Sequence, residues 1–409
     1  MAKTLIIKVA LFVVALCLLG SCSSPQQSVN SNGGTLLNLT WKSSTFNAPK
    51  NSALFGIDCI TSSVCITVGA SNLSTSAYST STAYKPAIFY SKNAGDTWDS
   101  SNIKLPVNIT TGIIDAIGCS KLACIAVGGS DPSGSGVPIA LISTNQGESF
   151  SPVNVSQISS GSFDGIYCYS QIDVQNKNNC ILVGNSGTTT NTNNLIVKLT
   201  LTNLAISMIN IPSKTNSYIN ALSCNNNSYC VALGGFTTGS QTNNSEILVS
   251  NNDGTSFTVA TFKSLPQTLL AVTCSSTQNC FIAGAGNTSL NSLGTPVGYP
   301  SIYEFQSQDS VSLKQPLILK SSQGLMTSIY CLNNNLSQCI AIGGQGSSKS
   351  FKSVISYLKN GTWQTQDVSI ADINLYSITC IGSSNSCIAV GNQTTKNNQS
   401  VPEVFKLNL

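Results

Sequence analysis

The chain alternates short apolar runs with polar loops, and one arrangement of the two recurs along it. An apolar run ends in a cysteine, a short polar loop follows, and a second cysteine opens another apolar run that ends in glycine. In residues 223–235, Cys224 and Cys230 flank a loop of Asn, Ser and Tyr, and Val231-Ala232-Leu233 then leads into glycine. Short apolar runs bounded by polar loops are typical of β-strands, so each unit predicts a hairpin.

The unit occurs seven times, and every copy contains two cysteines. The pairs are Cys59 with Cys65, Cys119 with Cys124, Cys168 with Cys180, Cys224 with Cys230, Cys274 with Cys280, Cys331 with Cys339, and Cys380 with Cys387. From Cys59 to Cys380 is 321 residues over six intervals, so the period is about 50–55 residues, within the range of propeller blades. Facing residues of a hairpin lie about 4.5–5.5 Å apart, which suits a disulfide between the two cysteines of each pair. Zinc is the competing interpretation, but the variable loops and the lack of histidine disfavour it.

Several units continue with two more apolar runs joined by a turn of similar sequence. The turns span residues 91–98, 143–150 and 250–257, with a variant at 360–363. They resemble the Asp-box, or BNR repeat, S-x-D-x-G-x-x-W, of sialidase-like propellers, with Asn in the Asp position and Phe in place of Trp twice. Asn can bond its own backbone and tolerate a left-handed conformation, and Gly supplies a positive φ. The resemblance implies four-stranded blades, with the box as a structural turn whose aromatic residue packs between blades.

The two ends of the repeat region are complementary. The seventh unit has its hairpin and one further run, residues 401–409, but no fourth strand. Residues 36–41 form an apolar run without a hairpin, and Thr40-Trp41 matches Thr97-Trp98. We therefore predict that residues near 36–46 form the outer strand of the last blade, which removes open sheet edges. The expected fold is all-β: a seven-bladed propeller over residues 35–409, with four-stranded antiparallel blades and one hairpin disulfide in each.

The N-terminal residues have the pattern of an export signal. Lys3 and Lys8 precede an apolar stretch at residues 9–19 that is too short to span a membrane. The stretch ends in Leu-Gly-Ser-Cys at residues 19–22, which resembles the bacterial lipobox. The resemblance implies that residues 1–21 are a signal peptide and that Cys22 is lipidated, with sorting to the outer membrane where the cell has one. An ordinary cleaved signal, leaving Cys22 free, is the alternative.

The composition after the signal fits an exported chain. Residues 22–34 are rich in Ser, Gln, Asn and Gly and predict a flexible tether. Sixteen cysteines, less Cys17 and Cys22, leave fourteen, an even set that indicates an oxidising compartment.

Missing residue types exclude several kinds of chemistry. Charged residues make up 8% of the chain, there is no histidine, and all nineteen basic residues are lysine. No Ser-His-Asp or Cys-His nucleophile can form, and we expect neither a metal nor a cofactor. Sialidases of the resembling family hold the substrate carboxylate with three arginines, so that mechanism is excluded. The lysines are dispersed without a basic run, which makes nucleic acid a poor partner.

Two aspartates are the candidates for a ligand site. Asp115 and Asp164 each lie four residues before the first cysteine of their unit, and Asn220 has the same place in the next unit. A glycan or cation site at one mouth of the central channel is the functional interpretation, because paired carboxylates are enough for glycoside hydrolysis. The alternative, which the residue types favour, is a polar residue at a strand start that hydrogen-bonds nearby backbone.

These observations predict a binding protein rather than an enzyme. The predicted function is a lipid-anchored, exported propeller that acts as a protein-binding or scaffold module in the cell envelope. A glycan-binding or glycoside-hydrolysing protein is the alternative. No sequence feature identifies the ligand, the partner or the propeller face that binds.

Overall fold

The computed structural model describes most of residues 40–408. The residues outside the description are 1–39, 47, 50, 74–83, 132–135, 170–177, 189–190, 213, 215, 226–227, 239–241, 261–267, 276–278, 291–295, 307–311, 320–322, 333–334, 348–349, 372, 382–385, 396–398 and 409. The predicted signal peptide, the tether and Cys22 therefore lie outside the described residues.

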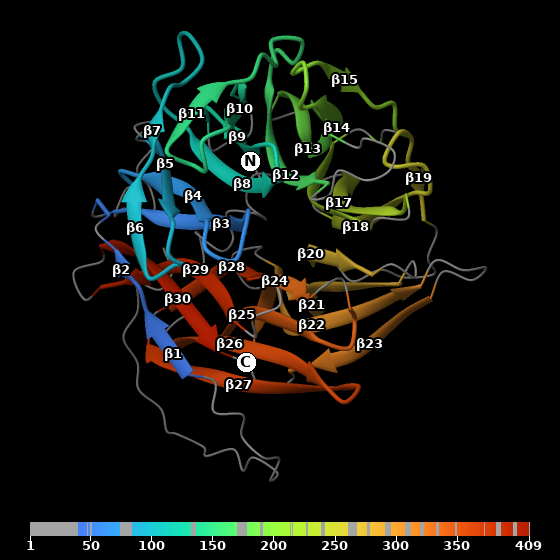
Figure 1. Cartoon of the computed structure of the whole chain (residues 1–409). Coiled ribbons are helices and arrows are strands. Elements are labelled where there is room, and N and C mark those ends of the chain that lie inside the picture. The colour runs from blue at the N-terminus through green and yellow to red at the C-terminus, as the bar shows by residue number, and fades with distance from the viewer. Residues whose placement is uncertain are drawn as a thin grey trace.

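Seven sheets surround a central axis, which confirms the predicted seven-bladed propeller (Figure 1). The described part of the chain contains no α-helix, and thus no helix that is long and apolar enough to cross a membrane. We number the blades 1 to 7 in chain order. Within each blade the first strand lies innermost and the fourth lies at the rim.

Blades 1 to 4 each contain four antiparallel strands. Blade 1 has β3 (Ala53–Cys59), β4 (Cys65–Ser71), β5 (Lys85–Ser91) and β6 (Thr97–Ser100). Blade 2 has β8 (Ile113–Cys119), β9 (Cys124–Gly129), β10 (Pro138–Ser143) and β11 (Ser149–Pro152). Blade 3 has β12 (Gly161–Cys168), β13 (Asn179–Thr188), β14 (Asn191–Thr200) and β15 (Ile206–Met208). Blade 4 has β16 (Ser217–Cys224), β17 (Cys230–Thr238), β18 (Thr242–Ser250) and β19 (Thr258–Val259).

Blades 5 to 7 follow the same order of strands. Blade 5 has β20 (Thr268–Cys274), β21 (Asn279–Leu290), β22 (Pro296–Gln306) and β23 (Ser312–Ile318). Blade 6 has β24 (Gly324–Cys331), β25 (Cys339–Ser347), β26 (Ser350–Lys359) and β27 (Thr362–Ala371). Blade 7 has β28 (Ile373–Cys380), β29 (Ser386–Thr394) and β30 (Ser400–Asn408), and its fourth strand is β1 (Thr40–Ser43).

The N-terminal strand closes the ring as predicted. β1 pairs antiparallel with β30, with Thr40 opposite Asn408 and Ser43 opposite Phe405. Two short strands extend the predicted four-stranded pattern. β2 (Thr45–Phe46) adds in parallel to the rim of blade 1, and β7 (Asn102–Ile103) adds in parallel to the rim of blade 2. In both cases the chain that leaves one rim strand covers the rim of the next blade.

Seven apolar clusters, one between each pair of neighbouring blades, form most of the core. The middle strands are buried on both faces, which explains their continuous apolar sequences. In β29, Ile388 and Val390 pack with Trp98 of blade 1, whereas Ala389 packs with Ile342 of blade 6. Alternate residues of one strand therefore face opposite interfaces, as the two-residue period of a strand requires.

Each hairpin contains its predicted disulfide, and all seven pairs match the pairing of nearest cysteines. The two Cα atoms of each pair are 3.8–4.1 Å apart. In blade 1 the next residue pair inside the loop is hydrogen-bonded, because Ile60 N–H donates to the Val64 carbonyl at 2.9 Å. The cysteines therefore occupy a non-hydrogen-bonded pair, where facing side chains come closest.

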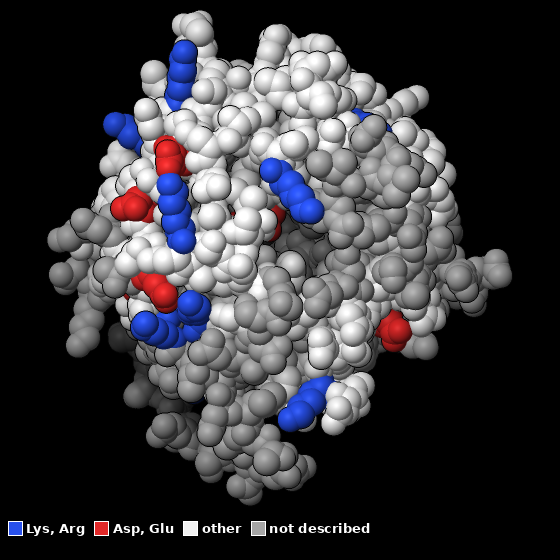
Figure 2. All heavy atoms as spheres, in the orientation of Figure 1, with Lys and Arg blue, Asp and Glu red and all other residues white. Residues whose placement is uncertain are grey.

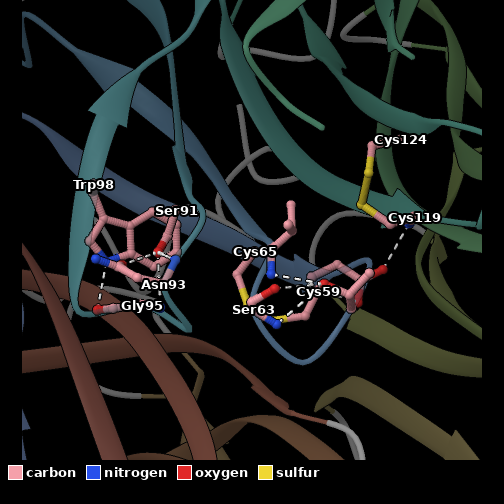
Figure 3. Close-up of a disulfide and its surroundings, with 12 residues drawn as sticks. Cys59, Ser63, Cys65, Ser91, Asn93, Gly95, Trp98, Cys119 and Cys124 are labelled. Atoms are coloured by element: carbon pink, nitrogen blue, oxygen red, sulfur yellow. Dashed lines mark hydrogen bonds between the residues drawn. A yellow bond between two sulfur atoms is a disulfide. The ribbon is translucent and has the colours of Figure 1, made fainter. Parts of the chain in front are cut away.

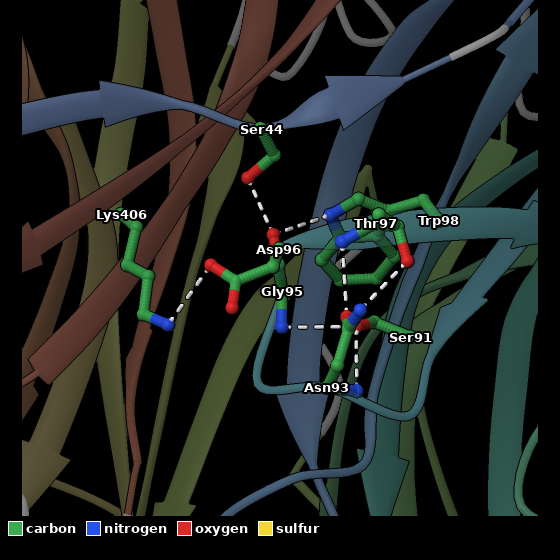
Figure 4. A network of polar contacts seen from close by, with 8 residues as sticks. All are labelled: Ser44, Ser91, Asn93, Gly95, Asp96, Thr97, Trp98 and Lys406. Carbon is green, nitrogen blue, oxygen red and sulfur yellow. Dashed lines mark hydrogen bonds and ion pairs between the residues drawn. The ribbon is translucent and has the colours of Figure 1, made fainter.

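The three full-length turns that resemble the Asp-box share one set of hydrogen bonds, and Figure 4 shows the first of these turns. The Asn93 side-chain oxygen accepts the Thr97 N–H at 2.9 Å, and its Nδ2 donates to Thr97 Oγ1 at 2.8 Å. In the three full-length turns the left-handed residue is the one after the Asn, as at Ala94 with φ 57° before Gly95 at 82°. In the variant turn Asn360 itself is left-handed, with φ 51°, as expected. Asn93 therefore fixes the turn through its side chain rather than through its own backbone conformation.

The aromatic residue that ends each of these turns packs against the preceding blade, as expected. Trp98 lies with Ile388 of blade 7, and Phe150 lies with Ile66 of blade 1. Ala94 N–H donates to the Ser63 carbonyl in the disulfide loop at 2.8 Å. The disulfide loops and these turns thus share one end of the propeller, which we call the disulfide face, and the other end is the opposite face.

Candidate functional site at the propeller axis

The innermost strands form a closed ring around the axis, since each contacts the innermost strands of both neighbouring blades. Each of these strands contains a β-bulge, where one residue has no partner on the second strand. The seven bulged residues, which we call the bulge ring, are Phe55, Asp115, Asp164, Asn220, Leu270, Thr327 and Tyr376. Each lies four residues before its first cysteine, about 13 Å along a strand from the disulfide face, and thus toward the opposite face.

Small residues bring neighbouring bulges close together. Gly56 follows the bulge of blade 1, and a Cβ there would lie 3.3 Å from the Asp115 carbonyl oxygen. Gly165 follows the bulge of blade 3, and a Cβ there would lie 2.8 Å from the Asn220 carbonyl oxygen. Side chains at these two positions would push the next blade outward, so the glycines keep the bulge ring narrow.

The bulge ring has a polar side and an apolar side. Asp115, Asp164 and Asn220 are its members from blades 2, 3 and 4. Phe55 of blade 1 and Tyr376 of blade 7 meet edge to face, with ring centroids 5.6 Å apart and planes at 64°. The structure therefore places the three predicted ligand residues at equivalent positions on successive blades, beside an aromatic pair.

Side chains of its own blade orient Asp164. Ser162 Oγ donates to Asp164 Oδ1 at 3.1 Å, and Asn185 Nδ2 approaches Oδ2 at 3.4 Å. The pKa of the Tyr218 hydroxyl is raised, first by burial and then by the negative charge of Asp164. Asp164 is half-buried, as is Asp115.

Two other members of the bulge ring bond to the neighbouring blade. Asn220 Nδ2 donates to the Leu269 carbonyl of blade 5 at 3.4 Å, and Thr327 Oγ1 donates to the Leu375 carbonyl of blade 7 at 2.7 Å. The innermost strand is a sheet edge, so its backbone groups need partners from elsewhere. Asn220 thus has the backbone-bonding role that was the alternative interpretation for these positions.

A second polar site lies on the innermost strands at the disulfide end. Asp58 Oδ1 accepts the N–H of Cys59 at 2.8 Å, and Oδ2 accepts the N–H of Cys119 in the next blade at 2.7 Å (Figure 3). Burial raises the pKa of Asp58 to about 6, although both backbone hydrogen bonds oppose the shift. Burial and the charge of Asp58 also raise the pKa of Tyr330 to about 12.

The sequence interpretation missed Asp58, Phe55 and Tyr376. Counting four residues back from every first cysteine would have found Phe55 and Tyr376, but only polar residues were considered at that position. Asp58 directly precedes a cysteine, and its partner Cys119 belongs to the next repeat, so spacing within one unit holds no signal for it.

The molecular surface is hollowed near the centre, where an acidic side chain is visible inside the hollow and a basic one at its edge (Figure 2). Among the described residues on this face, most of the other charged side chains lie together at the left of the view, where acidic and basic groups alternate. Within the described ranges, no three Asp, Glu, Cys or His side chains gather in a way that could hold a metal ion. The arrangement can bind through hydrogen bonds, charge and aromatic contact.

Comparisons with known proteins identify the fold. No protein-family model matches this chain, and no curated protein matches it in sequence. The solved structure of YCF48 bound to D1 peptide superimposes with a TM-score of 0.57 at 12% identity, over 91% of this chain and 98% of that one. A GH74 xyloglucanase from Xanthomonas campestris gives 0.50 at 11% identity, over 87% of this chain and 53% of the enzyme. Kuenenia stuttgartiensis hydrazine synthase superimposes with a TM-score of 0.50 at 8% identity, over 85% of this chain and 94% of that one.

Proposed function

We propose that the protein is an exported β-propeller, anchored to a bacterial membrane by a lipid on Cys22, that binds a protein partner in the cell envelope and holds it as a scaffold. The export signal and lipobox support the anchor. The seven disulfides support an oxidising compartment outside the cytoplasm, because cytosolic thiols are kept reduced.

The bulge ring carries the proposal. It sets an aromatic pair, Phe55 and Tyr376, beside the carboxylates of Asp115 and Asp164 on strands that are rigidly joined in a closed ring. Aromatic side chains surrounded by polar groups are the usual centres of protein interfaces, and a rigid site loses little entropy on binding. YCF48, which binds a D1 peptide, supports this use of a propeller of similar length.

Site-specific photo-crosslinking in the native envelope tests the proposal. A photoreactive phenylalanine analogue at position 55 should form an adduct with one protein, because Phe55 belongs to the bulge ring. The same analogue at Leu204, which is 36% exposed and lies outside the ring, is the matched control. A protein adduct from position 55 that is absent from position 204 supports the proposal. Absence of any adduct from position 55 contradicts it.

The anchor has a separate test. Cys22→Ala should move the exported chain from the membrane fraction to the soluble fraction without changing its thermal unfolding. Unchanged membrane association would contradict lipidation at Cys22.

A glycan-binding or glycoside-hydrolysing protein is the second candidate, and the same bulge ring favours it. Sugars offer hydroxyl groups to carboxylates and an apolar C–H face to aromatic rings, and both kinds of group occur in the ring. Envelope oligosaccharides incubated with the wild type and with Asp115→Asn/Asp164→Asn distinguish the cases. Hydrolysis by the wild type that the double variant loses would indicate an enzyme. Binding without hydrolysis would indicate a lectin-like protein. If the oligosaccharides are neither bound nor hydrolysed, the protein-binding proposal stands alone.

A further inference from the structure

The innermost strands of the propeller contain acidic residues and no basic ones, although the chain is basic overall. The protein has 19 basic and 15 acidic side chains, a net charge of +4. The seven innermost strands nevertheless contain three aspartates, Asp58, Asp115 and Asp164, and no lysine. The innermost strands are therefore negatively charged although the chain as a whole is positive, and a surface with one sign of charge attracts ligands of the opposite sign.

Two buried acceptors lie beside the acidic part of the bulge ring. Asn185 is 9% exposed and Asn220 is 8% exposed, and neither side-chain oxygen finds a hydrogen-bond donor in the described part of the chain. The amide orientations are fixed by their nitrogens, since Asn185 Nδ2 faces Asp164 and Asn220 Nδ2 faces the Leu269 carbonyl. Reversing either amide would set oxygen against oxygen. Each of the two oxygens therefore needs a hydrogen-bond donor, because a buried acceptor without one lowers the stability of the protein.

We propose that the polar side of the bulge ring, formed by Asp115, Asp164 and Asn220, binds a cationic side chain, lysine or arginine, of the protein partner. This inference rests on the proposed protein-binding function. A basic side chain offers several donors and a positive charge, which complement carboxylates and amide oxygens. Its aliphatic stem is apolar and suits contact with Phe55 and Tyr376, which lie beside the polar side of the ring. Ser162 and Asn185 position the Asp164 carboxylate for this contact.

Three heptapeptides that differ at one position test the inference. Each has the sequence Gly-Ala-Leu-X-Leu-Ala-Gly, where X is lysine, N-acetyl-lysine or glutamate, and binding to the protein is measured by calorimetry. We expect the lysine peptide to bind at least about tenfold more tightly than the acetylated one, because a hydrogen bond to a charged group contributes more than one to a neutral group. Binding should weaken as salt is added.

Charge-neutralising variants locate the binding. Asp115→Asn and Asp164→Asn should each lower the affinity for the lysine peptide about tenfold. Asp99→Asn makes the same charge change at an exposed position on rim strand β6 and should leave the affinity unchanged. Thermal unfolding of each variant checks that the fold persists, and the comparison of lysine with acetyl-lysine needs no variant at all.

The outcomes separate this inference from the proposed function. Equal affinity for the lysine and acetyl-lysine peptides, or no binding of any peptide, overturns the inference. Retention of the position-55 adduct in Asp115→Asn/Asp164→Asn would overturn it while leaving the protein-binding function intact. Absence of that adduct in the wild type would instead remove the proposed function itself.

Discussion

Asp58 of blade 1 accepts a hydrogen bond from the backbone N–H of Cys119 in blade 2, at 2.7 Å. The contact joins the innermost strands of two blades next to their disulfides (Figure 3). Ser223 Oγ repeats it between blades 4 and 5, since it accepts the Cys274 N–H at 3.1 Å. In blades 1 and 4 the residue before the first cysteine thus accepts a backbone N–H from the exposed edge of the following blade, and in blade 1 a carboxylate does so.

Asp58 should make stability depend on pH. Its pKa is about 6 in the folded protein against an ordinary 3.8, with burial as the main cause. The folded state then holds the proton more tightly, so the contribution of this group falls as pH rises from 3.8 to about 6 and is constant above that. From pH 4 to pH 7, the free energy of unfolding of Asp58→Asn should rise by roughly 1–3 kcal/mol relative to that of the wild type. The side chain keeps some contact with water, which limits the size of this change.

Urea unfolding of both proteins across this pH range measures the difference. Asp99→Asn, exposed on the rim, is the control and should show no such trend. A stability difference between Asp58→Asn and the wild type that stays constant from pH 4 to 7 would contradict the raised pKa.

The turn at Asn145 should tolerate aspartate but not alanine. The Asn145 side-chain oxygen accepts from Ser143 Oγ at 2.9 Å and from the Ser149 N–H at 3.1 Å. Asn145→Ala loses both bonds, together with the one that its Nδ2 donates to Ser149 Oγ at 2.9 Å, and should cost about 1–2 kcal/mol. Asn145→Asp keeps both acceptors, and the Ser149 hydroxyl can turn to donate, so stability should stay within about 0.5 kcal/mol. Equal destabilisation by the two substitutions in chemical unfolding would show that the amide nitrogen is essential.

The disulfide that closes the longest loop should contribute most. Cys168 and Cys180 are separated by 12 residues, against 6 for Cys274 and Cys280. The loop-closure entropy that each disulfide removes from the unfolded chain should stabilise the protein by about 2.8 kcal/mol for the longer loop and about 2.2 kcal/mol for the shorter one, a difference of about 0.6 kcal/mol. Paired substitutions to alanine, compared by urea unfolding, measure it. Reduction of all seven should lower the melting temperature without abolishing the fold, and complete loss of β-sheet circular dichroism in mild reductant would contradict this.

Removal of β1 should destabilise the propeller far more than removal of the residues before it. A chain that begins at residue 40 keeps the pairing of β1 with β30, whereas one that begins at residue 47 loses β1 and β2. The shorter chain exposes the edge of β30 and should unfold at lower temperature and associate, because an open strand edge pairs with other chains. Calorimetry and light scattering compare the two. Identical behaviour would mean that the closing strand adds nothing to stability.

The fold was predictable because its signals repeat. Seven cysteine pairs at a regular period set the number of blades, and a seventh unit with only three predicted strands pointed to the strand that contains Trp41. The equivalence of Asp115, Asp164 and Asn220 followed from their common distance to a cysteine. Their bonding did not, because the partners of Asn220 and Asp58 belong to neighbouring blades, and the distance between blades is set by packing rather than by spacing. The fifth strands, β2 and β7, are two residues long and leave no pattern to detect.

The pairing of Thr40 with Asn408 has a consequence for how the molecule is made. β1 precedes all seven first strands of the blades in the chain, and its partner β30 follows the first six blades, so β1 must wait until β30 has been made. Six blades can assemble from neighbouring segments during synthesis, but the seventh sheet joins residues more than three hundred positions apart and is completed only after β30 has been made. A product that stops before β30 therefore has no closed ring, and the edge of its first strand stays unpaired.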